Sequence, residues 1–203
     1  MAVVEVFADI ICPFTHVGLL RFVEQRAELG RHDVALHVRS WPLEVVNGQP
    51  HDGRFLMEEI DEIRRQAAPT MFEGVREASF PSSSLPALVL AAAAYERDVT
   101  VGEEVSLELR RLLFEEGVDV GDDRVLRGLA DRHGIDVDLG DTRRVMEDHA
   151  EGRERGVIGS PHFFTADGGF FCPALEVGRD EEGHLVVRPD PARFDRFVSS
   201  CFS

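Results

Sequence analysis

The sequence has 203 residues and 43% hydrophobic content, which is enough for one domain with a full core, or for one domain with a sizeable insertion. Its 38 acidic residues outnumber its 22 basic residues, all of them arginine, and the formal net charge is −16. Since such a surface is repelled by phosphate, we expect neither a nucleic acid nor an anionic membrane as a partner.

The N-terminal segment MAVVEVFAD contains no basic region and no cleavage site, so we interpret it as a strand and not as a signal peptide. No apolar run of about 18 residues occurs, and no membrane-spanning helix is expected. The three cysteines, at positions 12, 172 and 201, are an odd number and do not suggest a disulfide framework. We therefore expect a cytoplasmic protein.

The first predicted strand begins at Val3 and breaks at Asp9, and the motif CPFT at positions 12–15 then begins a helix. Pro13 suits a first helical position, which needs no N–H donor. The unpaired N–H groups of a first turn and the helix macrodipole favour a thiolate over a thiol. This pattern predicts that Cys12 is an exposed, reactive nucleophile with a lowered pKa. The alternative is that Cys12 is a small buried core residue.

The first helix is predicted to end at Gly30 and to pack one apolar stripe against a sheet. The stripe consists of His16, Leu19, Leu20, Val23 and Ala27. A second strand with alternating apolar residues runs from Val34 to Val38 and ends at Trp41-Pro42. Strand, helix and strand in this order predict a βαβ unit with parallel strands and a right-handed crossover.

The pattern changes to helices after the turn-rich segment 47–50. Apolar residues at helical spacing predict several further helices. Their stripes are Leu56, Ile60, Ile63 and Ala67; the nearly uniformly apolar segment from Pro86 to Arg97; Val105, Leu109, Leu112 and Leu113; Val125, Leu126, Leu129 and Ala130; and Val145, Met146, His149 and Ala150. Asp122 is predicted to be an N-cap, and Gly134 is predicted to end the same helix.

The period returns to two near the C-terminus, where two hairpins and a last helix are predicted. The first hairpin pairs residues 160–165 with 170–172 across a turn of residues 166–169. The second pairs residues 175–177 with 185–187 across a polar turn. The last helix follows Pro191, and its buried face is expected to carry Phe194, Phe197, Val198 and Cys201.

This order predicts an α/β protein with the thioredoxin fold and a helical domain inserted between its βαβ and ββα halves. The sequence resembles the DsbA-like branch of thioredoxin-fold proteins, the group that also holds 2-hydroxychromene-2-carboxylate isomerase and kappa-class glutathione transferase. In that family a Cys or Ser begins the first helix, a helical domain follows the second strand, and a cis-proline precedes the third strand. The matching segments here are 12–15, 54–155 and 156–161. We therefore expect a thioredoxin-like domain of residues 1–50 and 156–203 and an inserted all-helical domain of residues 51–155.

The resemblance implies that Cys12 is the nucleophile and that Pro161 is the cis-proline beside it. The backbone of Ser160 would then bind an extended thiol ligand as a short added strand, in the way that the family binds peptide or glutathione. The remaining candidates for binding substrate or thiol are Pro13, Phe14 and Trp41.

Thr15 and His16 are further candidates for catalysis, and each has an alternative role. The Thr15 hydroxyl is placed either to hydrogen-bond the Cys12 sulfur or to serve as an ordinary first-turn residue. His16, four residues after Cys12, lies on the same helix face and is a candidate for activating the thiolate. Because its cation is disfavoured near a helix N-terminus, we favour a neutral core histidine. Trp41 likewise fits a core or pocket-wall position better than a catalytic one.

One departure from the family matters for function. Its redox members carry Cys-Pro-x-Cys, whereas Thr15 occupies the second position here. Because a threonine hydroxyl cannot resolve a mixed disulfide, a self-contained dithiol cycle is not expected. The preferred hypothesis is a thiol-disulfide oxidoreductase with a single cysteine and an external low-molecular-weight thiol, glutathione or a functional equivalent.

Other classes of function stay open. The second hypothesis is a thiol-cofactor-dependent isomerase or transferase that acts on a small hydrophobic molecule, and the third is a redox-inactive binding module. A papain-like Cys-His hydrolase has only the cysteine on a helix in its favour. The sequence lacks a phosphate loop, a dinucleotide fingerprint and a tight Cys/His cluster, so it indicates no metal or nucleotide cofactor.

Cys172 is the other thiol to consider as a resolving group. In the predicted sheet the first and fourth strands point the same way, so Cys12 and Cys172 belong to the same end. Two strand spacings separate them by roughly 10 Å, whereas a disulfide needs Cα atoms within about 7 Å. We therefore expect Cys172 to be a buried strand residue, Cys201 to be a packing residue, and Cys12 to depend on an external thiol.

Overall fold

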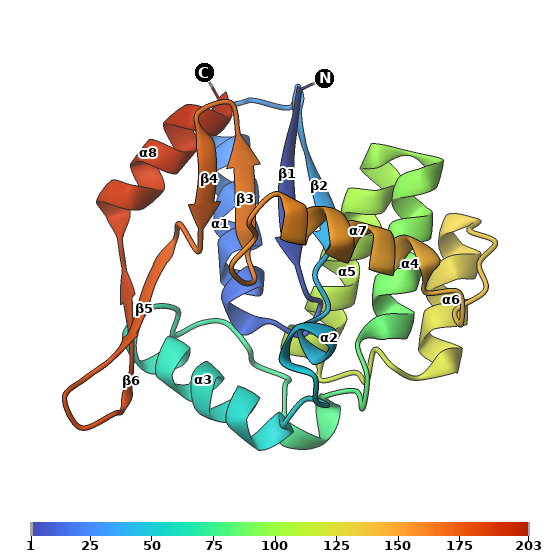
Figure 1. Cartoon of the computed structure of the whole chain (residues 1–203), viewed down its shortest axis with the longest axis horizontal. Helices are drawn as coiled ribbons and strands as arrows, with labels where there is room; N and C mark the ends of the chain where they lie inside the picture. The colour runs from blue at the N-terminus through green and yellow to red at the C-terminus, as the bar shows by residue number, and fades with distance from the viewer. Residues whose placement is uncertain (1, 203) are drawn as a thin grey trace.

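The computed structural model describes residues 2–202. Four strands form one mixed sheet in the order β2-β1-β3-β4, with helices on both faces and beside one edge (Figure 1). β1 (Ala2–Ala8) is parallel to β2 (Val34–Ser40), and β3 (His162–Thr165) is antiparallel to both β1 and β4 (Gly168–Phe171). This is the predicted thioredoxin arrangement, in which the first and fourth strands point the same way.

α1 (Pro13–Glu28) connects β1 to β2 and covers one face of the sheet together with α8 (Pro191–Phe202). Phe22 of α1 and Phe197 of α8 are fully buried, and their ring centroids lie 6.1 Å apart. The predicted stripe of the first helix is therefore partly wrong. Because α8 packs beside α1, Phe22 belongs to the core, whereas Ala27 in the last turn is exposed.

The opposite face of the sheet is covered by α7 (Arg143–Glu154). Gly152 of α7 approaches the aromatic rings of Phe7 and Trp41 so closely that a Cβ atom would lie 2.9 Å and 2.7 Å from them. Because Gly152 faces the sheet, the buried face of α7 differs from the predicted apolar stripe. Met146, which the stripe placed in the core, is exposed. The buried face of α7 consists of Val145, Asp148 and Gly152.

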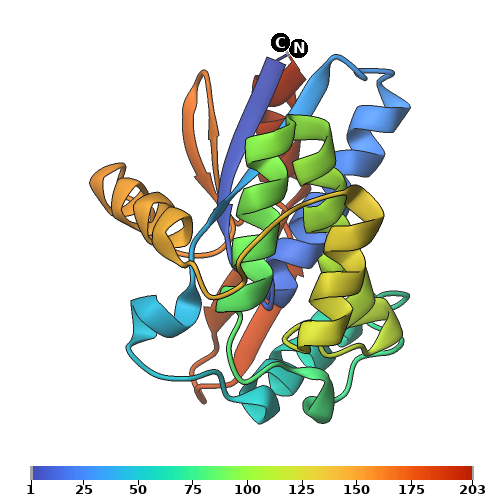
Figure 2. The same cartoon turned by 90° about the vertical axis from the view of Figure 1, so that its right-hand side faces the viewer.

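The helical segment between β2 and α7 contains the predicted helices and two short ones. Its elements are α2 (Leu43–Asn47), α3 (Gly53–Gln66), the 3-10 helix η1 (Glu77–Ser79), α4 (Leu85–Arg97), α5 (Val99–Glu116) and α6 (Asp123–His133). Asp122 caps α6 by accepting the N–H groups of Arg124 and Val125, and Gly134 follows with a φ of +60°, both as predicted. The sequence did not predict α2, because five residues carry no measurable period. Figure 2 shows α4 and α5 beside β2, and α6 packs against these two helices.

Side chains of the helical segment close the outer edge of β2. Glu103 of α5 accepts the N–H of Leu36 at 2.7 Å, and Asp148 of α7 accepts the N–H of Ser40 at 3.0 Å. Tyr95 of α4 donates its hydroxyl to the carbonyl of Leu36 at 3.2 Å. An edge strand otherwise exposes unpaired backbone groups. These bonds therefore fix the helical segment against the sheet and block pairing of this edge with another chain.

The C-terminal part begins with a tighter hairpin than the predicted one. β4 already starts at Gly168, where φ is +121°, so the turn comprises only residues 166–167. A separate two-stranded sheet of β5 (Leu175–Arg179) and β6 (Leu185–Pro189) follows and packs against α3. None of the helices within residues 2–202 combines the length and the apolarity needed to cross a membrane.

Candidate active site

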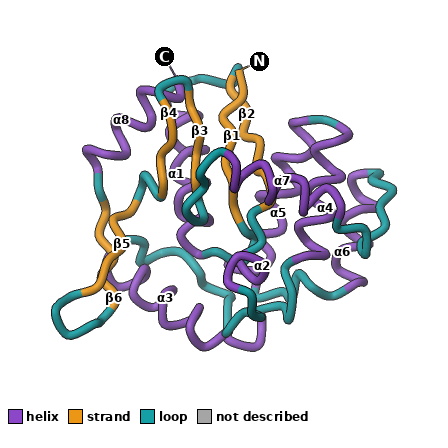
Figure 3. The backbone as a smooth tube through the Cα atoms, in the orientation of Figure 1, coloured by secondary structure: helices purple, strands orange, loops and turns teal. Residues whose placement is uncertain are grey.

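The candidate site lies where β1 ends and α1 begins. The predicted nucleophile Cys12 is the N-cap of α1, and Pro13 stands in the first turn, which contains no acidic residue. The second part of the site is the segment before β3, where the peptide bond between Ser160 and Pro161 is cis. Both segments are drawn as loops in Figure 3, and they meet through Cys12 and Ser160.

Hydrogen bonds hold these two segments in one register. The Cys12 thiol donates to the carbonyl of Ser160, with an Sγ to oxygen distance of 3.1 Å. The hydroxyls of Thr15 and Ser160 lie 2.8 Å apart, and the N–H of Asp9 donates to Oγ of Ser160 at 3.0 Å. The structure thus brings together three of the predicted site residues, Cys12, Thr15 and Ser160.

The Cys12 thiol is buried, with 3% of the residue exposed, and this burial raises its pKa above the ordinary value of 9.0. Hydrogen bonding from Ser160 and Thr15 lowers the pKa, whereas the charge of Glu59 raises it further. The prediction of an exposed thiol with a lowered pKa is therefore wrong for this conformation, because the loss of water outweighs the helix N-terminus. A thiol that donates to a carbonyl is also a protonated one.

Asp9 is a buried site residue that sequence reasoning did not assign. Its carboxylate accepts the N–H groups of Leu43 at 2.6 Å and Ile11 at 3.3 Å and the hydroxyl of Ser84 at 3.1 Å. Burial raises the pKa of Asp9, and these hydrogen bonds act against the increase. Asp9 thus ties the loop before Cys12 to the starts of α2 and α4. The signal that could have identified it is an acidic residue at the end of an apolar strand.

Arg110 of α5 is a second residue that the sequence did not single out. It is fully buried and donates from Nη2 to the carbonyl of Asp9 at 3.1 Å and from Nη1 to Oγ of Ser106 at 2.7 Å. Burial lowers its pKa to about 10, so the guanidinium remains a cation at neutral pH. Among the described side chains, Nε of Arg110 finds no hydrogen-bond partner. A buried positive charge therefore lies against the segment that carries Cys12.

His16 is directed into the helical segment. Its Nε2 lies 2.7 Å from Oε1 of Glu115, and its ring stacks on Phe114 with centroids 4.8 Å apart. Burial lowers the pKa of His16, although Glu115 acts in the opposite direction. With Nε2 protonated, the neutral ring donates to the Glu115 carboxylate. His16 is thus the buried neutral histidine that the sequence favoured, and its hydrogen bond is directed to Glu115.

The predicted binding residues differ in their relation to Cys12. Pro13 and Phe14 are buried, and Phe14 shares a core cluster with Cys12 and with the buried residues of α3. Trp41 is not brought to this cluster. It packs with Phe7 and Val157 on the opposite face of the sheet, and its indole N–H has no partner among the described residues.

The other two cysteines are buried free thiols. Cys172 lies just after β4 and not within it, with a φ of +45°, and its N–H donates to the carbonyl of Pro161 at 2.9 Å. Burial raises the pKa of Cys172 to about 12, and the charge of Cys12 adds to this effect. Cys201 lies on the buried face of α8, and burial also raises its pKa to about 12.

A thiol ligand and a metal ion would use different parts of the molecule. The backbone carbonyl of Ser160 faces the Cys12 sulfur, where the sequence predicts a thiol ligand. Within residues 2–202, one group of metal-type ligands has its atoms within 4.8 Å of one another, namely Asp180, Glu182 and His184 in the exposed turn between β5 and β6. This turn is not part of the two loops that form the site.

Comparison with known families agrees with this geometry. A family model described as the DSBA-like thioredoxin domain matches residues 3–179. A search of curated proteins finds no match.

Several solved structures share the fold. A 2-hydroxychromene-2-carboxylate isomerase is 15% identical with a TM-score of 0.61, and the match covers 83% of this chain and 88% of the isomerase. The cytosolic disulfide reductase DsbM from Pseudomonas aeruginosa is 15% identical with a TM-score of 0.59, covering 97% of this chain and 95% of DsbM, which has also been solved with glutathione. A probable DsbA oxidoreductase from Streptomyces coelicolor is 23% identical with a TM-score of 0.57, covering 81% of this chain and 80% of that one. At these identities the likenesses establish the fold.

Proposed function

The chain belongs to the family of DSBA-like thioredoxin domains, and on this premise we propose that it is a thiol-disulfide oxidoreductase that works with the single nucleophile Cys12. The observation that carries the proposal is the contact between the Cys12 thiol, at the N-terminus of α1, and the Ser160 carbonyl before the cis-proline. Thr15 stands where a resolving cysteine would be, and its hydroxyl is bonded to Ser160.

The first step of the reaction forms a mixed disulfide. The Cys12 sulfur attacks one sulfur of a substrate disulfide, the substrate S–S bond breaks, and the other half leaves as a thiol after it takes up the proton that Cys12 loses. Thr15 cannot attack this intermediate, so a low-molecular-weight thiol, glutathione or a functional equivalent, must release Cys12. The disulfide reductase DsbM, which shares this fold, has been solved with glutathione, and this supports a small thiol as the second substrate.

Ser160 supplies a binding contact in this mechanism. While Cys12 is a thiol, its S–H occupies the carbonyl of Ser160. When Cys12 forms a mixed disulfide, that carbonyl loses its donor and becomes free to accept an N–H from the backbone of the bound thiol. The neighbouring carbonyl of Pro161 is already bonded to the N–H of Cys172. Formation of the mixed disulfide therefore creates a binding contact at Ser160.

The test is turnover of a small mixed disulfide of glutathione, measured with free glutathione as the second substrate. We expect ping-pong kinetics in the wild-type protein, a glutathione adduct on Cys12 in mass spectra, and no turnover in Cys12→Ser. Cys201→Ser, at a buried position on α8, is the matched control and should retain turnover. A Cys12→Ser variant as active as the wild type would refute the proposal.

A second candidate is an isomerase or transferase that binds a thiol cofactor and uses the cofactor's own thiolate. One observation favours it: the Thr15 and Ser160 hydroxyls lie 2.8 Å apart beside the helix N-terminus, and the hydroxyl that accepts this bond keeps its own O–H to donate to a bound thiolate. In this reading Cys12→Ser keeps its activity toward a small hydrophobic electrophile with glutathione present, whereas Thr15→Val loses it. The two variants together distinguish the candidates.

A further inference from the structure

The segment between α7 and β3, residues 156–160, carries the carbonyl group that faces the Cys12 thiol. This segment contains no helix or strand, so contacts with other parts of the chain must hold it in place. Its last residue is fixed by the side chain of Ser160, whose Oγ bonds the N–H of Asp9 and the hydroxyl of Thr15. The middle of the segment is held from β3, by His162.

His162 is the first residue of β3 and is buried, with 8% of the residue exposed. Its Nδ1 accepts the backbone N–H of Ile158 at 3.3 Å. Because only a ring nitrogen without a proton can accept this bond, the neutral ring carries its proton on Nε2. Nε2 lies beside Gly169 of β4, where a Cβ atom would be 2.7 Å away. Gly169 is exposed and has no side chain to cover this nitrogen.

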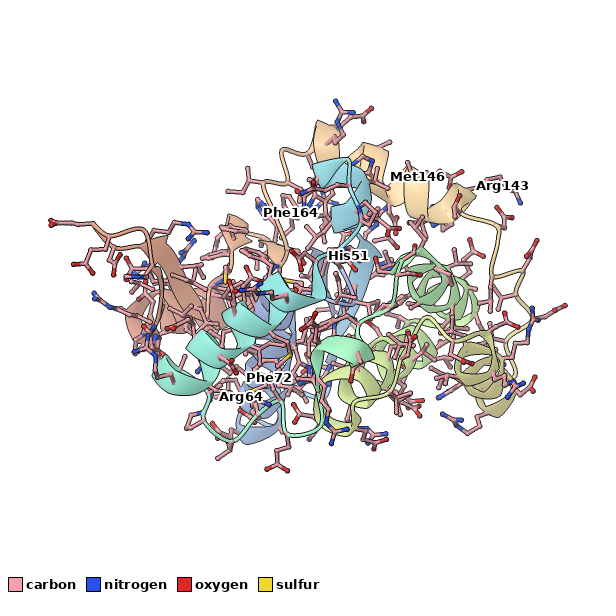
Figure 4. All side chains as sticks on the ribbon, turned by 90° about the horizontal axis from the view of Figure 1, so that it is seen from below. His51, Arg64, Phe72, Arg143, Met146 and Phe164 are labelled. Carbon is pink, nitrogen blue, oxygen red and sulfur yellow. The ribbon has the colours of Figure 1, made fainter. Side chains whose placement is uncertain are left out.

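Aromatic neighbours fix the orientation of the His162 ring. The ring stacks on Phe164 with centroids 4.8 Å apart and an interplanar angle of 7°, and the Phe171 ring lies 6.3 Å away. Figure 4 shows Phe164 on the side of the sheet toward α7. Phe171 also packs beside Gly159, where a Cβ atom would lie 2.6 Å from its ring. Stacking thus keeps Nδ1 directed at the N–H of Ile158.

The charged groups around His162 favour its neutral form. Burial lowers the pKa of His162, and the positive charge of Arg155, just after α7, lowers it further. The nearby carboxylates, Glu5 of β1 and Glu151 of α7, accept hydrogen bonds from Arg155 at 2.8 Å and 3.2 Å. β4, on the other side of β3, contains no titratable side chain. His162 is therefore neutral at pH 7 and binds a proton only below pH 6.5.

We propose that His162 positions the Ser160 carbonyl for a thiol ligand by holding the 156–160 segment through its unprotonated Nδ1, a role that rests on the proposed function. When a proton from solvent binds Nδ1, this nitrogen becomes a donor that faces the N–H of Ile158, and the hydrogen bond is lost. The segment then loses its central attachment, and the Ser160 carbonyl loses its fixed position beside Cys12. Acid therefore weakens the binding of the thiol substrate.

The experiment replaces His162 by residues that keep or remove the acceptor, in the full-length protein. In His162→Asn the side-chain oxygen stands near the position of Nδ1 and accepts an N–H at every pH. His162→Leu removes the acceptor. His149→Asn is the matched control, because His149 is a half-buried histidine on the same face of the sheet whose ring lies 5.1 Å from that of Trp41.

The first readout is the KM of the glutathione mixed disulfide between pH 7.5 and pH 5. Variants are compared at each pH, because protonation of Cys12 slows all of them alike. Over this range the KM of the wild type should rise about three- to tenfold more than that of His162→Asn, the effect of one hydrogen bond. His162→Leu should show the higher KM already at pH 7.5, with kcat near that of the wild type. His149→Asn should follow the wild type.

The second readout does not depend on activity. Long-range proton–nitrogen NMR of the histidine rings should show His162 protonated on Nε2 at pH 7.5. The backbone amide signal of Ile158 should shift below pH 6.5 with the same midpoint as the His162 ring. In His162→Asn this amide signal should not titrate in that range.

The outcomes separate this inference from the proposed function. A His162 ring protonated on Nδ1 at pH 7.5 overturns the inference, and so does a His162→Asn variant whose KM rises with acid as steeply as that of the wild type. If the wild-type protein shows no disulfide turnover but the Ile158 amide follows the titration of His162, the hold of His162 on the segment stands and the oxidoreductase proposal fails.

Discussion

The reactivity of Cys12 is decided by opposing influences on one sulfur atom. The N-terminus of α1 and the hydrogen bonds of Ser160 and Thr15 favour the thiolate, whereas burial and the charge of Glu59 favour the thiol. Burial is the largest of these and raises the pKa. In this conformation Cys12 is therefore held as the neutral thiol.

The first prediction follows for alkylation of the three cysteines. Iodoacetamide should modify Cys12 slowly at pH 7, with a rate that rises above pH 9, because burial raises its pKa above that value. Cys172 and Cys201, whose pKa values are about 12, should react still more slowly. Peptide mass spectrometry after timed quenching measures all three, and unfolding in urea should remove the differences. A Cys12 rate midpoint below about 8.5 would contradict the burial argument.

The second prediction concerns Thr15→Cys, which restores a second cysteine in the first turn of α1. Residues three apart in a helix have Cβ atoms about 5–6 Å apart, which suits a disulfide after a small adjustment. We expect an internal disulfide under mild oxidation, seen as the loss of two hydrogens. Turnover should become less dependent on glutathione, and the lost Thr15 to Ser160 bond should cost about 1 kcal/mol of stability.

Thr15→Ser is the control for this change. It keeps the hydroxyl that bonds Ser160, so the single-thiol behaviour should persist. If Thr15→Cys still accumulates a glutathione adduct on Cys12 as stably as the wild type, position 15 is not the resolving position.

The packing of α7 on the sheet shows how single elements are placed. Gly152 lets α7 approach Trp41 and Phe7, and Arg39 of β2 donates to Asp148 at 2.6 Å on the same helix. The helix is therefore positioned by a close backbone approach and by the ion pairs of Arg39 with Asp148 and Glu151. Only Val145 of its predicted apolar stripe is buried.

The third prediction compares glycines in two helices. Gly152→Ala places a Cβ 2.7 Å from the Trp41 ring and 2.9 Å from the Phe7 ring. We expect it to destabilise the protein by about 1–3 kcal/mol despite the better helix propensity of alanine. Gly128→Ala in α6 meets only the end of the Arg132 side chain, at 3.9 Å, and should stabilise by about 0.5–1 kcal/mol. Urea unfolding measures both, and equal effects would refute the close approach.

The elements differ in how far the sequence predicted them. Strands, caps and long helices follow local rules, and the sequence predicted β1, β2 and the Asp122 cap correctly. The buried faces of α1 and α7 depend on which helix or strand lies alongside, information that the spacing of apolar residues does not contain. The site residues likewise divide into those that local sequence rules identify and those that depend on tertiary packing. Cys12 and Ser160 are found by motif, whereas Arg110 comes from the helical segment and reaches the site only through tertiary packing.

In the whole molecule, polar contacts join the helical segment to the sheet and to α1. Glu103 and Asp148 bond the edge of β2, Arg110 bonds the carbonyl of Asp9, and Glu115 bonds His16. A buried polar contact stabilises only while both partners keep the required protonation state. The attachment of the helical segment should therefore depend on pH.

The fourth prediction uses the His16 to Glu115 contact between α1 and α5. Burial lowers the pKa of His16 in the folded state, so below its ordinary value of 6.5 the unfolded chain binds a proton that the folded chain resists. The stabilising effect of His16 is therefore present above pH 6.5 and is lost as pH falls.

We expect His16→Gln to be less stable than the wild type at pH 7.5, by about 1–3 kcal/mol, because the ring loses its contacts with Phe72 and Phe114. The difference should narrow toward pH 5.5. Urea unfolding at both pH values measures it, with His32→Gln at an exposed position as the control. A difference that stays constant with pH would show that His16 does not titrate differently in the folded and unfolded states, and it would contradict the pH dependence proposed for this contact.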